Sequence, residues 1–181
     1  MLDFSKNYFE LFGLPVGYVL DTQQLAERYR ELQRVVHPDR YASASEQERR
    51  LSMQGSILIN EAYESLKNPI RRAHYMLILH GIDMDARQEA TRDTAFLMEQ
   101  LELREQLEET RNSPDPYQAI SNLMDGISKR INTLVGQMAV QFEAATPDEL
   151  EEAREILRKM QFLQKLRFDA ESLETELDEA L

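Results

Sequence analysis

The feature that most constrains the fold is a proline that ends one long helical pattern shortly before a second one begins. Residues 21–36 repeat apolar side chains every three or four positions, which is the spacing of one buried helix face. Pro38 disfavours the helical conformation at His37 and so stops this helix. Ser45 and Glu48 form a capping-box pattern that starts the next helix. The segment between the two helices is therefore a short and sharply bounded loop.

Two further helical segments belong to the N-terminal part of the chain. Residues 8–14 are rich in aromatic and aliphatic side chains and predict one or two helical turns. Asn68 as the cap and Pro69 at the first helical position start another helix, which Gly81 ends. Together with the two helices above, these segments predict a four-helix domain in residues 1–80.

Three longer helical patterns follow a polar joint at residues 81–93. The first runs from about residue 94 to residue 111 and ends at a turn with two prolines. The second repeats apolar side chains at threes and fours over residues 120–142, and the third carries its stripe over residues 146–163 before an acidic tail. No alternating strand pattern occurs, so the predicted fold is all-α, with a three-helix bundle in residues 94–181.

The net charge of −12 is unevenly distributed between these parts. Residues 1–80 hold ten basic and ten acidic side chains, whereas residues 81–181 hold eleven basic and 23 acidic ones. The acidic half would repel the phosphates of a nucleic acid, so we expect no nucleic-acid partner. The uneven charge instead indicates two domains with different partners.

Composition also excludes several kinds of site. The absence of cysteine excludes a disulfide framework, a thiolate metal site and a cysteine nucleophile. The three histidines, His37, His74 and His80, are too few and too scattered for a metal cluster, and no cofactor is expected. The N-terminus has no leader pattern, and no apolar run approaches the ~20 residues of a membrane span, so a cytoplasmic protein without a membrane partner is expected.

His37, Pro38 and Asp39 invite an enzymatic interpretation, with histidine as the base and aspartate as the group that orients it. The sequence supplies no matching nucleophile, because it has neither cysteine nor a Gly-x-Ser-x-Gly motif. An ordinary loop that ends a helix is the plainer alternative. A hydrolase centred on His37 and a structural helical adaptor both stay open on these residues alone.

The surroundings of this loop point to a known family. A helix with exposed arginines precedes His-Pro-Asp-Arg-Tyr, and the next helix ends in Ile-Asn-Glu-Ala-Tyr-Glu-Ser-Leu at residues 59–66. The pattern continues with Asn68-Pro69, Arg71-Arg72-Ala73 and Tyr75, and it opens with Tyr-Phe-Glu-Leu-Phe-Gly-Leu at residues 8–14. Over residues 7–79 the chain resembles the DnaJ-type J-domain, although Arg40 stands where many J-domains have lysine.

This resemblance implies that the domain binds a DnaK-class ATPase chaperone and stimulates its ATP hydrolysis. Asp39 can accept charge-assisted hydrogen bonds from an arginine of the partner, and Pro38 keeps the loop stiff. The arginines form a cationic face that would meet an acidic ATPase surface, or else a merely solvated helix face. The predicted chaperone-binding residues are Arg30, Arg34, His37, Pro38, Asp39 and Arg40.

The segment from Arg92 to Glu105 resembles the HscB family, the J-type co-chaperones of bacterial iron–sulfur cluster assembly. Phe96, Leu103 and Leu107 lie within about 40° of one another on this helix and form an ordinary buried stripe. Leu97, Met98 and Leu101 lie on a second face, roughly 100° to 200° away. A helix in a small bundle needs only one buried stripe, so the second face predicts a partner site.

Phe162, on the last helix, lies some 200° around from Met160 and is a second candidate for an exposed anchor. The resemblance implies an HscA-type chaperone and an IscU-type scaffold protein as partners, and a co-chaperone without catalysis of its own. Packing against another helix is the alternative for the apolar residues, and a solvated surface is the alternative for the acidic ones. The predicted scaffold-binding residues are Leu97, Met98, Leu101, Glu102, Glu105 and Phe162.

Overall fold

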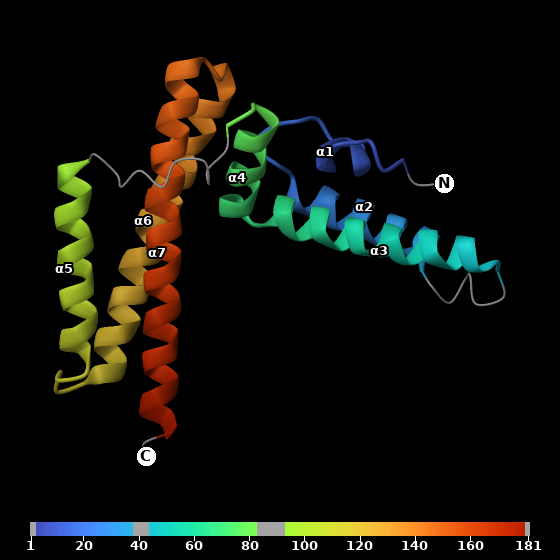
Figure 1. Cartoon of the computed structure of the whole chain (residues 1–181). Helices are drawn as coiled ribbons and strands as arrows, with labels where there is room; N and C mark the ends of the chain where they lie inside the picture. Colours follow the sequence, from blue (N-terminus) through green and yellow to red (C-terminus); the bar gives the residue numbers. More distant parts are fainter. Residues whose placement is uncertain (1–2, 38–43, 83–92, 180–181) are drawn as a thin grey trace. The chain divides into compact units, whose positions relative to one another are not determined.

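The computed structural model describes residues 3–37, 44–82 and 93–179, and these ranges contain seven helices and no strand (Figure 1). The chain divides into two compact units, Met1–His80 and Gly81–Leu181. The predicted all-α fold is confirmed, with four helices in the first unit and three in the second. Each helix in the described ranges is either too short or too polar to span a lipid bilayer.

The first unit contains two short helices and a long helical pair. Its elements are α1 (Tyr8–Leu11), α2 (Thr22–Val36), α3 (Glu46–Lys67) and α4 (Pro69–Leu79). The helix starts follow the predicted caps: Ser45 and Glu48 close a capping box on α3, and the Asn68 side chain accepts from the main chain of α4. The helices α2 and α3 lie side by side and antiparallel (Figure 1).

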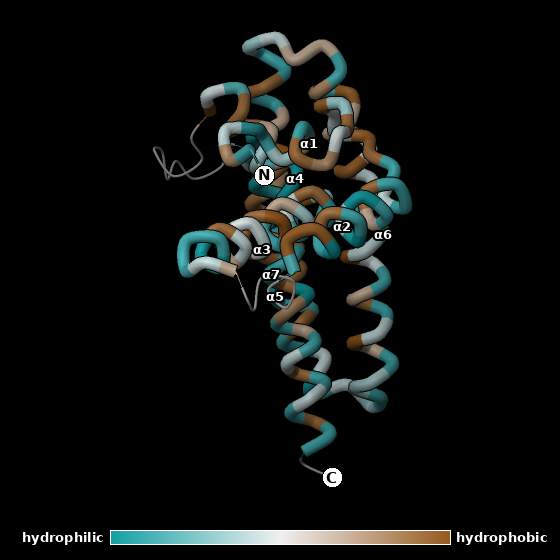
Figure 2. Tube along the Cα trace, turned by 90° about the vertical axis from the view of Figure 1, so that its right-hand side faces the viewer, coloured by the Kyte–Doolittle hydropathy of each residue, from teal (hydrophilic) through white to brown (hydrophobic). Residues whose placement is uncertain are grey.

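Aromatic and polar contacts hold α2 and α3 in register. The rings of Tyr29 and Tyr63 stack with their centroids 4.1 Å apart. The Tyr29 hydroxyl also donates a 2.9 Å hydrogen bond to Oδ1 of Asn60. Hydrophobic residues are interspersed with hydrophilic ones along both helices (Figure 2), and the apolar side chains of Leu25 and Ile59 are fully buried. This register fixes the position of the end of α2 relative to α3.

A buried arginine stabilises the other end of the first unit. Nη1 of Arg72 donates a 2.7 Å hydrogen bond to the Leu66 carbonyl, and the guanidinium lies 5.0 Å from the centre of the Tyr18 ring. Burial lowers the pKa of Arg72 and raises the pKa of Tyr18 to about 12. The Arg72 charge therefore has a structural role in the core of this unit.

The second unit is a three-helix bundle of α5 (Thr94–Thr110), α6 (Pro116–Ala144) and α7 (Pro147–Glu179). The helix α6 runs antiparallel to both α5 and α7 (Figure 1). The predicted apolar stripes meet in its core, because Leu103 of α5, Ile127 of α6 and Leu163 of α7 belong to one buried cluster. Thr146 and Glu149 form the predicted capping-box contacts at the start of α7.

The last helix is longer than the sequence predicts. We expect an acidic tail after Leu163, but α7 continues to Glu179. Its buried stripe also continues, since Leu166, Ala170 and Leu173 follow Leu163 at steps of three, four and three residues. The expected end of the stripe at Leu163 was wrong, because charged residues of both signs (Lys165, Arg167, Asp169 and Glu171) lie between the later apolar positions and obscure their spacing.

Candidate partner-binding sites

The predicted cationic face lies on the exposed side of α2. Arg30 and Arg34 are one helical turn apart and both are exposed. Nε of Arg30 donates a 3.2 Å hydrogen bond to the Ala26 carbonyl, which holds the side chain along its own helix. Arg28 pairs with Glu31 at 3.0 Å beside them. The structure therefore brings Arg30 and Arg34 together on a surface that a partner can reach.

A buried hydrogen bond fixes the end of α2 where this face meets the loop. Oγ of Ser52 on α3 donates to the main-chain carbonyl of Val36 at 2.6 Å. His37 follows directly as the C-cap residue and is exposed. Pro38, Asp39 and Arg40 lie outside the described residues, so their predicted contacts stay a prediction. The sequence analysis missed this role of Ser52. The available signal was that a small polar residue lies on the buried face of α3.

The helix α5 has two apolar faces, as predicted. Phe96 and Leu103 are buried against the bundle. Leu97, Met98 and Leu101 are 41%, 59% and 59% exposed, respectively, and are called here the apolar face of α5. The two predicted acidic residues beside this face, Glu102 and Glu105, are also exposed.

Phe162 of α7 lies next to this helix but is half-buried, not exposed as the helical wheel of α7 alone predicts. Its ring packs edge-to-face on the Phe96 ring at 5.7 Å between centroids. The guanidinium of Arg104 lies 5.4 Å from the centre of the same ring. Phe162 is therefore part of the contact between α7 and α5 and keeps only part of its surface for a partner.

An ion pair joins the start of α5 to α7. Oδ1 of Asp93 caps α5 by accepting from the main-chain N–H of Phe96 at 3.0 Å, and its Oδ2 accepts from Nζ of Lys159 at 2.6 Å. These hydrogen bonds, the one from Lys159 first, hold the pKa of Asp93 below its usual value. Sequence reasoning missed this pair because Lys159 lies 66 residues away, beyond any local pattern.

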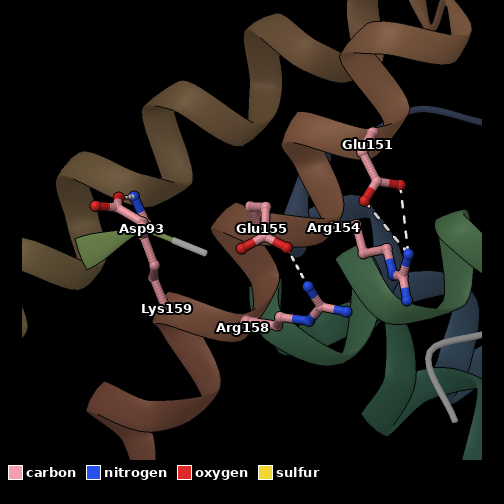
Figure 3. A network of polar contacts seen from close by, with 6 residues as sticks. All are labelled: Asp93, Glu151, Arg154, Glu155, Arg158 and Lys159. Atoms are coloured by element: carbon pink, nitrogen blue, oxygen red, sulfur yellow. Dashed lines mark hydrogen bonds and ion pairs between the residues drawn. The ribbon is translucent and has the colours of Figure 1, made fainter. Parts of the chain in front are cut away.

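Further ion pairs run along the side of α7 around Lys159. Arg154 pairs with Glu151 and Arg158 pairs with Glu155, each across one turn of the helix (Figure 3). Within the described residues, no group of three or more histidine or acidic side chains could hold a metal ion.

Comparison with known proteins assigns the family. Residues 7–75 match the model of the DnaJ domain, and residues 92–171 match that of the HSCB C-terminal oligomerisation domain. The chain belongs to the HscB family of J-domain co-chaperones. The co-chaperone protein HscB homolog of Shewanella loihica is 44% identical over 171 residues, which cover 94% of this chain and 99% of that one.

Two solved HscB structures have the same fold. The chaperone HscB from Vibrio cholerae superposes with a TM-score of 0.82 at 39% identity, covering 95% of this chain and 99% of that one. Human co-chaperone protein HscB superposes with a TM-score of 0.86 at 31% identity, covering 95% of this chain and 84% of that one. The J-domain and the C-terminal helical domain therefore occur here in the combination typical of the HscB family.

Proposed function

We propose that this chain stimulates the ATPase of an HscA-type, DnaK-class chaperone and delivers an IscU-type iron–sulfur scaffold protein to it. The J-domain would contact the chaperone, and the C-terminal bundle would hold the scaffold. Both partners would then meet on one co-chaperone, so that ATP hydrolysis fixes the chaperone on the delivered scaffold. The protein would act as an adaptor in the maturation of iron–sulfur proteins, without catalysis of its own.

The chaperone contact is supported by the arrangement at the end of α2. Arg30 and Arg34 present two positive charges on one exposed helix face, and the exposed His37 is the C-cap residue of the same helix. Such a face speeds encounter with an acidic surface more than it strengthens the final complex. Together with the loop residues Pro38, Asp39 and Arg40, it would form the chaperone-binding site.

The observation that carries the scaffold contact is the second apolar face of α5. Three large apolar side chains, Leu97, Met98 and Leu101, are exposed on one side of a helix whose other side already fills the core. Solvent-exposed apolar groups of this size are a common mark of a protein-binding surface. Exposed Glu102 and Glu105 beside them would contact polar or basic groups at the rim of such an interface.

A single-turnover ATPase assay with a purified HscA-type chaperone tests the first contact. The wild-type protein should accelerate hydrolysis, and Asp39→Ala should not, although its helical circular dichroism is retained. Replacing Arg30 and Arg34 together with glutamine should slow the association and make it less sensitive to salt. Full stimulation by the Asp39→Ala variant would contradict the loop assignment.

Titration calorimetry with a purified IscU-type scaffold tests the second contact. The triple change of Leu97, Met98 and Leu101 to alanine should abolish scaffold binding but retain stimulation of the chaperone in the absence of scaffold. Val140→Ala is the matched control, because Val140 is an exposed apolar residue of α6 outside this face. Scaffold affinity that is unchanged in the triple variant would show that the site lies elsewhere.

A further inference from the structure

The helix α5 is joined to α7 by an ion pair at each of its ends. At its start, Asp93 accepts from Lys159 at 2.6 Å. At its end, Arg111, the C-cap residue, donates to Glu176 at 2.5 Å. Only the first of these pairs lies near the apolar face, whose members are the fourth, fifth and eighth residues of the helix.

The start of α5 has little buried surface of its own to hold it in place. Between residues 94 and 102, Phe96 is the one side chain that is buried. The first turn of a helix also lacks intrahelical partners for its N–H groups and frays readily unless it is capped. Glu99 adds an ion pair to Arg130 of α6 at 2.8 Å, but this pair ties α5 to α6 and not to the helix that carries Phe162.

The Asp93–Lys159 pair supplies a link between the start of α5 and α7. One carboxylate oxygen caps the helix through the N–H of Phe96, and the other binds Lys159. The Lys159 ammonium also lies 5.5 Å from the centre of the Phe96 ring, and that ring packs edge-to-face on Phe162. One aspartate and one lysine thus connect the cap of α5 with the aromatic contact between the two helices.

We propose that Asp93 and Lys159 are positioning residues for scaffold binding: their ion pair holds the first turns of α5 so that the apolar face stands at a fixed distance from Phe162. This inference rests on the proposed function, in which the apolar face of α5 binds the scaffold, and takes Phe162 as part of the same site, as the resemblance to the HscB family implies. A surface that is already ordered loses less conformational entropy when a partner docks. The pair would therefore increase scaffold affinity without touching the scaffold.

The pair suits this role better than a role in overall stability. The side chains of Lys159 and Asp93 are 23% and 37% exposed, respectively, and ion pairs that water reaches contribute little to folding. Its removal should leave the bundle folded while α5 gains freedom at its start. The effect of a substitution should then appear in scaffold affinity and in the contact between the Phe96 and Phe162 rings.

Three variants separate the charge pair from the helix cap. Asp93→Asn removes the charge but keeps a side chain that caps helices equally well. Lys159→Met removes the partner charge and keeps much of the side-chain length, and Lys159→Arg keeps the charge. We expect Asp93→Asn and Lys159→Met each to weaken the affinity for purified IscU-type scaffold by roughly three- to tenfold in titration calorimetry. The double variant Asp93→Asn/Lys159→Met should lose no more affinity than the more affected of the two single variants, because both remove the same ion pair. Lys159→Arg should retain most of the wild-type affinity.

A spectroscopic measurement on the free protein tests the same inference without the scaffold. Nuclear Overhauser contacts between the Phe96 and Phe162 rings should weaken in Asp93→Asn and Lys159→Met and persist in Lys159→Arg. Glu176→Gln is the matched control, because it breaks the ion pair at the far end of α5. It should change neither the ring contacts nor the scaffold affinity.

The outcomes distinguish this inference from the proposed function. If the wild-type protein binds scaffold and both single variants bind it equally well, the positioning role is excluded and the proposed function stands. An equal loss of affinity in Glu176→Gln would also overturn it, because the effect would then not belong to the start of α5. If the wild-type protein does not bind the scaffold at all, the proposed function and this inference both fail.

Discussion

Ser52 of α3 donates a buried 2.6 Å hydrogen bond to the main-chain carbonyl of Val36, the last residue of α2. Carbonyls in the last turn of a helix accept no hydrogen bond within the helix, so this one needs a donor from elsewhere, which Ser52 supplies. His37 is the next residue along the chain. The helix α3 therefore fixes the point and the direction at which the chain leaves α2 toward the predicted chaperone-binding loop.

The Ser52→Ala variant should lower the stimulation of the chaperone ATPase several-fold, because the base of the loop loses its tether. The lost buried hydrogen bond should also cost about 1 kcal/mol of stability. Single-turnover ATPase measurements and urea unfolding followed by circular dichroism would give the two values. Ser172→Ala is the matched control, since Ser172 donates to the Phe168 carbonyl within its own helix α7. Equal stimulation by both variants would exclude a role for the Ser52 contact.

Leu101 and Leu103 lie two positions apart on α5 and offer a direct test of its two faces. Leu103 is 1% exposed and Leu101 is 59% exposed. Leu103→Ala should destabilise the protein by about 3 kcal/mol, as other buried leucines do when truncated. Leu101→Ala should change stability by no more than about 0.5 kcal/mol but weaken scaffold binding. Urea unfolding and calorimetry on the same two variants measure both effects, and a large stability loss in Leu101→Ala would contradict the assignment of the faces.

Arg72 and Arg71 are neighbours on α4 with opposite environments. Arg72 is buried, donates to the Leu66 carbonyl and packs on Tyr18, whereas Arg71 is exposed. Arg72→Met should destabilise the first unit by about 3 kcal/mol, because a charged hydrogen bond and a desolvated cation–π contact are lost. Arg71→Met should have almost no effect. Amide hydrogen exchange, which reports each unit separately, should show faster exchange in α3 and α4 for Arg72→Met alone.

Local sequence signals predicted the helices of this protein well, because short capping motifs mark where several of them begin. Ser45 with Glu48, and Thr146 with Glu149, mark helix starts that the structure places at the expected residues. These motifs work because the cap satisfies main-chain N–H groups within one turn, so no distant residue is needed. The two apolar faces of α5 could be predicted for a similar reason, since a helix fixes the angle between its own side chains.

Contacts between helices were beyond the reach of the sequence. The helical wheel of α7 places Phe162 away from the stripe of Met160, but it does not show that α5 also packs on α7 and covers part of that ring. Asp93 pairs with Lys159, and Ser52 with Val36, and in each pair the two residues lie on different elements. No sequence motif links the two members of either pair. Positioning contacts of this kind depend on the tertiary arrangement of the helices, which cannot be deduced from a single sequence.

The junction between α6 and α7 offers a stabilising substitution. Ala145, the C-cap of α6, has φ +49° and ψ +38°. This is the left-handed region of backbone conformation, which is unfavourable for residues that carry a Cβ atom. Ala145→Gly should therefore stabilise the protein by about 0.5–1 kcal/mol. Ala144→Gly, one residue earlier and within α6, should instead destabilise it, because glycine lowers helix propensity. Thermal and urea unfolding of the two variants should show shifts of opposite sign.

The Asp93–Lys159 pair predicts how the start of α5 responds to acid. The pKa of Asp93 is lower in the folded protein than in the unfolded chain, first because Lys159 donates to it and next because the N–H of Phe96 does. Because this pKa is lowered, the carboxylate stabilises the folded form at pH values above the pKa of aspartate in the unfolded chain, about 3.9. The contribution is lost as the pH falls through the lower pKa of Asp93 in the folded protein. The ring contacts between Phe96 and Phe162 should accordingly persist from pH 7 down to about pH 4 and weaken only below it, as the pH falls through the lowered pKa of Asp93. Nuclear magnetic resonance across this range would follow them, and Asp93→Asn should show weak contacts at every pH. Contacts in the wild-type protein that already fade near pH 6 would point to another titrating group.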